Sequence, residues 1–407
     1  MPLPQEAPTK IWNKNFICVC LGNLGLGFAN FSINPLVASY TTFLGAGAEL
    51  MGLLTGMYFG ISLLMKPVSG PAMTKIDKRH LMIFTFAIGG VANLGYAAFH
   101  TLLMFAVFRL LSGIEYSLVG GLLLVLAGDC LPADRMTAGI GFYGVGQAVG
   151  MALAPSIGIW LVDLGTGLRD EAFGYTILFL FAAAVLFLSV IPALILRPVR
   201  RSREEIASTG AWYKNILTPH ALPTALVLML VFLSYALLNA YVVNLAEEQH
   251  IGDVNAFFLV LAAVIALSRP ICGHLTDKYG VGKTALPSII IYAAAFLIIG
   301  FSKSLVMILI GAAAAAIGSG GSQPTIQAMG MQTEAPVKRS VASNTMYIGM
   351  DLGFFLGPIL GGFVEGRSNF AAVFKVGAIP LALAAVCFVI ILPMFKRRVA
   401  QLRDAGQ

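Results

Sequence analysis

Long apolar stretches, separated by short polar segments, make up almost the whole chain of 407 residues. Most of these stretches approach the ~20 consecutive apolar residues that a helix needs to cross a bilayer. The pattern therefore predicts an all-α integral membrane protein with twelve transmembrane helices. The twelve runs cover residues 15–37, 50–72, 81–99, 101–127, 138–162, 173–196, 219–246, 254–272, 284–301, 304–328, 340–364 and 370–395.

The composition agrees with a membrane protein and argues against a soluble one. Hydrophobic residues make up 58% of the chain, charged residues only 11%, and the mean hydropathy is +0.85. Ordinary soluble domains are ~25% charged. The net charge of +7 is scattered over short loops, so we expect a lipid bilayer as partner and no nucleic acid. The five cysteines show no metal-ligand spacing and are interpreted as small buried hydrophobes, so no metal is expected.

The distribution of basic residues predicts the orientation of the chain. An even number of spans puts both termini on one side of the membrane. Cytoplasmic loops are enriched in lysine and arginine. With the termini inside, the inner segments hold most of the bases, including the cluster at 197–203, whereas the outer segments and span ends hold few. We therefore expect a multi-pass protein of the cell (inner) membrane with both termini cytoplasmic. The polar start of the chain predicts no cleavable signal, so the first run is retained as a helix.

The longest polar interruption follows the sixth run, between Arg197 and Asn215. It is interpreted as a solvated linker with a basic face toward the membrane. It divides the chain into an N-terminal six-helix bundle at 1–196, a cytoplasmic linker at 197–216 and a C-terminal six-helix bundle at 217–407.

The two halves repeat each other at one fixed offset. "KPVSGPAMTK" begins at Lys66 and "RPICGHLTDK" begins 203 residues later, at Arg269. Halves of six spans each have the same orientation, which predicts a pseudo-two-fold axis along the membrane normal and a site near the midplane between the halves. The same offset relates Gly150 to Gly353, Ala154 to Gly357, Pro155 to Pro358, Gly158 to Gly361 and, in the preceding loops, Arg135 to Lys338.

Several short motifs carry a resemblance to a known family. "GHLTDKYGVGK", from Gly273 to Lys283, fits the loop motif G-x-x-x-D-K/R-x-G-x-x-K/R of the major facilitator superfamily. "RLLSG", from Arg109, and "GMALAPSIG", from Gly150, are similar to the fourth- and fifth-helix motifs of proton-coupled drug antiporters, with Ala154 in place of a glycine. Over essentially its whole length the chain resembles the twelve-helix drug:proton antiporters. The N-half loop "GPAMTKIDKRH" departs from the motif at Thr74, Asp77 and His80.

The resemblance implies a fold, a cavity and a conformational gate. The fold is two pseudo-symmetric six-helix bundles working by alternating access, and the first, fourth, seventh and tenth helices line the cavity. An acid at the inner end of the fourth helix pairs with bases of the loop motif, so the expected gate is Asp129 with Lys75 or Arg79. Asp277 and Lys278 belong to the corresponding C-half loop. Thr74 removes one acid from this network, and the alternative is a set of solvated loop charges of little energetic value.

Charges inside membrane spans are costly and indicate function or pairing. Lys66 and Arg269 lie near the inner helix ends, where they either snorkel to the surface or contact a gate. Arg109, Glu115 and Asp351 lie deeper and are the candidates for proton coupling. Desolvation and a neighbouring arginine act in opposite directions on the pKa of a carboxyl, and a balanced carboxyl can load and release a proton. The alternative is a permanent ion pair or a carboxyl hydrogen-bonded to another helix.

Uncharged polar residues within the runs mark the predicted substrate cavity. Hydrogen bonds between helices are the alternative explanation for any one of them. Aromatic and methionine side chains on the same helices indicate an amphipathic cavity. The candidates are Asn30, Asn34, Tyr116, Tyr143, Gln147, Tyr235, Asn239, Gln323 and Tyr347.

The predicted function is proton-coupled export of small amphipathic organic compounds by a monomer. One alternative is a symporter or facilitator for an organic anion held by Arg109, and another is a membrane sensor or enzyme that transports nothing. The sequence has no phosphate-binding G-x-x-x-x-G-K-S/T, no H-E-x-x-H and no G-x-S-x-G, so neither an enzyme nor a cofactor is expected.

Overall fold

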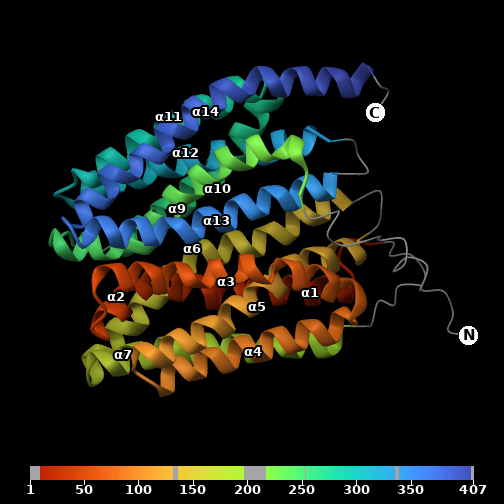
Figure 1. Ribbon diagram of the computed structural model, residues 1–407. Coiled ribbons are helices and arrows are strands. Elements are labelled where there is room, and N and C mark those ends of the chain that lie inside the picture. The colour runs from red at the N-terminus through yellow and green to blue at the C-terminus, as the bar shows by residue number, and fades with distance from the viewer. Residues whose placement is uncertain (1–9, 132–135, 197–216, 253, 335–338, 405–407) are drawn as a thin grey trace, which may run out of the picture. The chain divides into compact units, whose positions relative to one another are not determined.

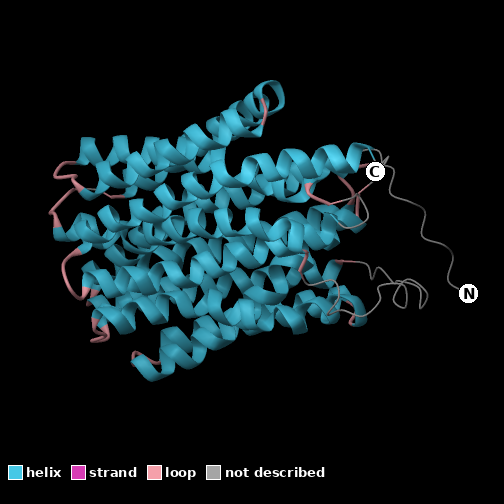
Figure 2. Ribbon diagram, turned by 45° about the horizontal axis from the view of Figure 1, so that its top comes forward, coloured by secondary structure: helices cyan, strands magenta, loops and turns pink. Residues whose placement is uncertain are grey.

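The computed structural model describes residues 10–131, 136–196, 217–252, 254–334 and 339–404. These residues form helices joined by short connections, with no strand among them (Figures 1 and 2). The helices are α1 Lys14–Ile33, η1 Asn34–Leu36, α2 Val37–Phe43, α3 Ala48–Lys75, α4 Lys78–Ala98, α5 Leu102–Asp129, α6 Met136–Leu168, α7 Glu171–Ile195, η4 Pro219–Ala221, α9 Leu222–Glu248, α10 Asn255–Tyr279, α11 Val281–Gly300, α12 Leu305–Gln332, α13 Arg339–Glu365 and α14 Phe370–Asp404.

The predicted spans appear as helices at the expected places. Within the described residues, eleven helical segments are long and apolar enough to cross a membrane. The remaining predicted run, 138–162, lies in the 33-residue helix α6, of which Leu153–Leu168 forms a shorter apolar segment. The prediction of an all-α multi-pass membrane protein is confirmed.

Polar residues between the runs begin the helices. Thr101, Asp170 and Ser304 accept hydrogen bonds at the starts of α5, α7 and α12, which satisfies backbone N–H groups that lack partners in the first turn. Asp77 does the same for α4, because its carboxylate accepts the backbone N–H groups of Arg79 and His80.

Asp77 also explains one departure from the loop motif. Its counterpart 203 residues on is Gly280, which has φ +86° at the junction of α10 and α11. Glycine adopts this left-handed conformation without steric cost. Asp77 has φ −58° and starts its helix with a side-chain cap instead, so the two halves turn the chain by different means.

Packing divides the chain into two compact units. Unit 1 contains Met1–Ile33 and Leu64–Gly210, and unit 2 contains Asn34–Leu63 and Ala211–Gln407. The segment 34–63 belongs with the second unit because the first half of α3 packs on α13, where Gly52 and Gly362 bring the two backbones together. Glycine has no Cβ, and one added at Gly362 would lie only 3.0 Å from Cα of Gly52. The predicted linker, 197–216, lies outside the described residues, and the predicted domain bounds stay a prediction.

Glycines let one helix lie directly on another in both units. In unit 2, a Cβ added at Gly353 of α13 would lie 2.8 Å from the backbone nitrogen of Leu233 in α9. In unit 1, a Cβ added at Gly150 of α6 would lie 2.9 Å from the backbone of Gly27 in α1. Contacts closer than ordinary van der Waals distance leave no room for side chains at these positions. The sequence repeat therefore corresponds to one packing arrangement used twice.

Candidate functional site

In unit 1, a polar cluster lies between α4 and α5. The hydroxyl groups of Tyr96 and Ser112 are hydrogen-bonded at 2.9 Å. Arg109 is close enough to hydrogen-bond with Tyr96, and Glu115 acts electrostatically on the same hydroxyl. Arg109 is only 3% exposed and Glu115 only 1%. Two of the three predicted proton-coupling residues therefore lie in one buried group, together with Tyr96 and Ser112, which the sequence analysis did not single out.

Glu115 fills a slot that a glycine opens in α4. A Cβ added at Gly89 would lie 2.9 Å from Cγ of Glu115, so any larger residue at position 89 would collide with the glutamate. Within the described residues, the Glu115 oxygen Oε1 is buried and has no hydrogen-bond partner. Buried polar atoms are rarely left so, and each such atom needs an explanation.

The repeat-related place in unit 2 has the same contact with large and small residues exchanged. Gly318 of α12 is 203 residues after Glu115, and Tyr292 of α11 is 203 residues after Gly89. A Cβ added at Gly318 would lie 2.7 Å from the backbone of Tyr292. The Tyr292 hydroxyl is also buried and without a hydrogen-bond partner in the described part of the chain. Since the second half is built with a glycine at the place of Glu115, the fold does not require a carboxyl there.

In unit 2, Asp351 lies buried on α13 beside an aromatic cluster. Tyr347, one turn earlier on the same helix, acts electrostatically with it. One turn later, the Phe354 ring stacks on Phe59 with centroids 4.3 Å apart. The Tyr235 ring meets Phe354 edge-on at 5.9 Å. This arrangement combines one acid with a large aromatic surface.

The other predicted cavity residues belong partly to each unit. Asn239 donates to the Tyr235 carbonyl at 2.8 Å, and the Tyr143 carbonyl accepts from Asn23 at 3.0 Å. Gln323 is buried, and its Nε2 has no hydrogen-bond partner among the described residues. Their meeting in one cavity stays a prediction. Asn30 and Tyr116 are half-buried in unit 1, Asn34 is half-buried in η1 of unit 2, and the side chain of Gln147 lies outside the described residues.

The predicted gate acid has a partner that the sequence analysis did not choose. Asp129, at the end of α5, forms an ion pair with Lys78, the first residue of α4. Arg79 donates to the backbone carbonyl of Leu194 in α7. Lys78 is better placed than Arg79 to pair with Asp129, because Lys78 lies on the buried face of α4 and is only 4% exposed.

The rest of the predicted gate stays a prediction. The side chains of Lys75 and Asp277 lie outside the described residues. Lys278 is exposed and lies 5.2 Å from the centroid of the Tyr279 ring.

Replacing Lys78 with methionine is expected to lower the stability of the protein. The substitution leaves Asp129 without its charge partner, and because the Asp129 side chain is 22% exposed, the expected cost is about 1–3 kcal/mol, below that of breaking a fully buried pair. Thermal unfolding in detergent measures the loss. The double variant Lys78→Met/Asp129→Leu is expected to recover most of it, and the exposed Lys278→Met serves as a matched control. Equal melting temperatures for Lys78→Met and Lys278→Met contradict the role of the pair.

A second polar cluster joins the ends of α12 and α14 to the start of α9. Glu334 is buried and accepts hydrogen bonds from Thr218 and from Nδ1 of His220, the latter at 2.9 Å. Arg398 donates to the carbonyl of Thr333 at 3.1 Å. Burial disfavours the charged form of Glu334, but the hydrogen bonds from Thr218 and His220 and the charges of His220 and Arg398 outweigh it. The pKa of Glu334 therefore lies below its usual 4.5.

Acidification is expected to destabilise the protein through Glu334. A carboxyl with a lowered folded-state pKa contributes stability above its unfolded pKa, and that contribution is lost as the pH falls through the folded value. Glu334→Gln is expected to cost about 1–3 kcal/mol at neutral pH. Melting temperatures measured from pH 7 down to below pH 4.5 should fall less in Glu334→Gln than in the wild type. Glu171→Gln, at an exposed position, should keep the wild-type profile, and identical profiles for all three proteins contradict the prediction.

A transporter of small molecules is the class that this architecture is typical of: repeated helical bundles with charged side chains buried in membrane spans. The model of the Major Facilitator Superfamily matches residues 19–265 and 224–406. The chain belongs to this superfamily. It is a multi-pass membrane transporter and not an enzyme, and the predicted family and fold class are confirmed.

Two groups of relatives carry names related to drug export. The chain is 25% identical to the "Multidrug resistance protein MdtG" of Enterobacter lignolyticus, over 94% of this chain and 93% of that protein. It is 22% identical to the "Multi-drug resistance efflux pump PmrA" of Streptococcus pneumoniae, over 92% of this chain and 95% of that protein.

Solved transporter structures share the fold. A bacterial homologue of the human lysosomal transporter Spinster, inward-facing and occupied, gives a TM-score of 0.74 at 17% identity and covers 94% of this chain and 96% of its own. The peptide transporter POT in complex with sulfate gives 0.73 at 12% identity, over 96% and 97%. At such identities the likeness concerns the fold alone.

Proposed function

We propose that this protein exports small amphipathic organic compounds by alternating access, driven by protons that move in the opposite direction. The observation that carries the proton part is Glu115, a buried carboxyl with an unpartnered oxygen at a place where the repeat has a glycine. A carboxyl shielded from water can exchange a proton when access to one side or the other opens. Asp351 is the second candidate, because it is buried beside an aromatic surface able to contact an apolar compound.

The relatives support the export part of the proposal. Proteins named for multidrug resistance and efflux align with this chain over nearly its whole length. The aromatic cluster of Phe59, Tyr235 and Phe354 suits organic compounds with apolar rings. We further propose a monomer in the cell (inner) membrane with both termini cytoplasmic, on the basis of the basic residues in the predicted inner loops.

Transport by the purified protein in liposomes tests the proposal. A fluorescent amphipathic dye is added outside, and a pH gradient is imposed in either direction. With an acidic lumen, we expect dye to accumulate inside as protons leave, with the luminal pH rising faster when dye is present. Accumulation only with an acidic exterior indicates a symporter instead. Dye movement that does not depend on the pH gradient indicates a facilitator. Dye binding without transport across the membrane indicates a sensor.

A further inference from the structure

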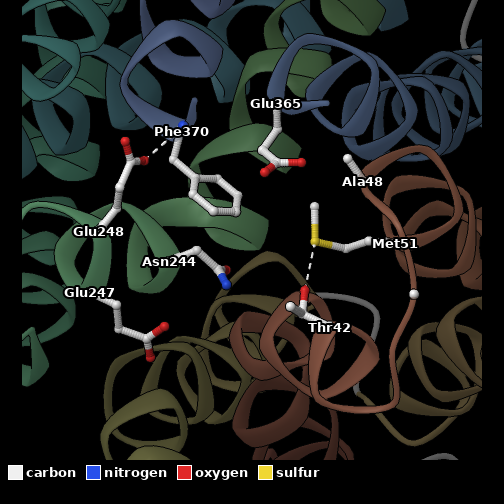
Figure 3. A pocket seen from close by; sticks show the side chains of 9 residues that line it. Thr42, Ala48, Met51, Asn244, Glu247, Glu248, Glu365 and Phe370 are labelled. Carbon is white, nitrogen blue, oxygen red and sulfur yellow. Dashed lines mark hydrogen bonds between the residues drawn. The ribbon is translucent and has the colours of Figure 1, made fainter. Parts of the chain in front are cut away.

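Two cavities of similar size lie toward opposite ends of unit 2, and their charges differ in sign. The one shown in Figure 3, of about 270 Å³, is lined by Glu247, Glu248 and Glu365 at the end that the loop charges predict to face outward. The other, of about 240 Å³, opens toward the predicted cytoplasmic end. Lys283 is the one charged side chain in its described lining, so this second cavity suits an anionic group.

The second cavity is a groove between α10 and α11. On α10 its lining includes Cys272, Leu275 and Tyr279, whose spacing of three and four residues puts them on one helix face. On α11 the lining runs from Lys283 to Ile291. Both helices pack on α12 more extensively than on each other, which leaves the seam between them open.

A glycine of α12 brings the two walls of the groove together at its floor. A Cβ added at Gly321 would lie 2.9 Å from Sγ of Cys272 in α10 and would collide with Oγ of Ser288 in α11. The Ser288 hydroxyl already donates to the carbonyl of Thr284 at 2.8 Å. The floor is therefore closed, and this hydroxyl does not require a polar ligand.

The rim of the groove is apolar and as deep as one leaflet of the membrane. Leu275, Ile291 and Ile317 line it and are exposed, as expected of side chains that contact lipid. Eight residues of α11 separate Lys283 from Ile291, a rise of ~12 Å at ~1.5 Å per residue. Half of the hydrocarbon core measures ~15 Å. The groove can therefore hold much of an acyl chain.

Positive charge gathers at the cytoplasmic mouth of the groove. Lys283 is exposed there, and its long side chain can place the ammonium group at the level of lipid head groups. The helix α11 starts two residues earlier, after Gly280, which makes no side-chain cap. The first backbone N–H groups of a helix carry a partial positive charge that favours an anion. Lysine and helix start thus act in the same direction.

We propose that this groove binds one anionic phospholipid of the cytoplasmic leaflet. Its phosphate lies at Lys283 and the start of α11, and one acyl chain follows the groove past Leu275 to Ile291 and Ile317. The continuous apolar groove behind the charge favours a lipid over a free phosphate ion. The site needs neither proton coupling nor transport, because α10, α11 and α12 form it alone.

Native mass spectrometry of the whole detergent-purified chain, titrated with dioleoylphosphatidylglycerol, tests the site. Dioleoylphosphatidylcholine has the same acyl chains and no net charge, and serves as the comparison. The anionic lipid is expected to bind about fivefold more tightly, which is the contribution of one lysine near a membrane surface. Equal affinity for the two lipids overturns the proposal. Displacement of the anionic lipid by an equal concentration of glycerol 3-phosphate also overturns it, because such a site needs no acyl chain.

Matched variants locate the head group. Lys283→Gln is expected to lose most of the preference for the anionic lipid, since it removes the charge at the mouth of the groove. Lys396→Gln, exposed at the cytoplasmic end of α14, should keep the wild-type preference. An unchanged preference in Lys283→Gln, or an equal loss in both variants, overturns the proposal.

A second pair of variants locates the acyl chain. Ile291→Trp is expected to lose most of the bound lipid of either kind, because the larger ring occupies the groove. Ile290→Trp is the control, because Ile290 is exposed on the same helix but does not line the groove. Equal lipid binding by Ile291→Trp and Ile290→Trp contradicts the placement of the chain.

Discussion

Glu115→Gln is expected to reduce gradient-driven transport to the level of protein-free liposomes while the protein stays folded. Glutamine fills the same slot beside Gly89 but cannot take up or release a proton. Among the described residues the Glu115 oxygen Oε1 has no hydrogen-bond partner, so replacing the carboxyl with an amide breaks no hydrogen bond at that oxygen. The effect should therefore fall on coupling and leave the melting temperature near that of the wild type.

Two transport assays separate coupling from a general loss of function. Exchange of labelled for unlabelled dye at equal pH on both sides needs no net proton movement, and Glu115→Gln should retain it. Tyr292→Phe removes the buried hydroxyl at the equivalent contact of the other half and should transport like the wild type. Asp351→Asn is measured in parallel as the second candidate. Full gradient-driven transport by both Glu115→Gln and Asp351→Asn rules out these carboxyls as the proton carriers.

Gly353→Ala is expected to destabilise the protein, because the added methyl group meets the backbone of α9. The added Cβ lies 2.8 Å from the Leu233 backbone nitrogen and 3.0 Å from Cβ of Phe232, so α9 and α13 have to move apart. Overpacking of this kind costs about 1–3 kcal/mol. The same face carries Gly349, Gly357 and Gly361, and separation at one glycine loosens contacts at the others.

A fall in the melting temperature of the detergent-purified variant measures this cost. Gly144→Ala is the matched control, because Gly144 also lies within a helix but has no atom within 4 Å of an added Cβ. That control should be neutral or slightly stabilising, since alanine favours helix more than glycine does. A Gly353→Ala protein as stable as Gly144→Ala contradicts the close approach of α9 and α13.

The sequence was sufficient for the features that depend on periodicity and spacing. The apolar runs predict the helices because lipid sets their length, and the fixed offset of 203 residues predicts the repeated packing of Gly150 and Gly353. The difference between Asp77 and Gly280 is visible in the sequence, but its meaning depends on backbone angles.

Features that depend on helix rotation could not be predicted in the same way. Lys78 and Arg79 are both basic and adjacent in sequence, and only the orientation of α4 decides that Lys78 reaches Asp129. The slot for Glu115 depends on a glycine 26 positions earlier, on another helix. The offset of 203 residues could have revealed this slot, because at the equivalent contact between Tyr292 and Gly318 the large and small residues are exchanged.

The helix α3 belongs to both units, with residues up to Leu63 in unit 2 and residues from Leu64 in unit 1. The chain's earlier crossing between units, at Ile33 and Asn34, coincides with the short 3₁₀ turn η1 and Pro35, where the helix is already interrupted. The later crossing has no such interruption. The first half of α3 is held to α13 through Gly52 and Gly56, whose missing side chains bring the two backbones together. Separating these two helices would therefore uncover α3 backbone that no side chain covers.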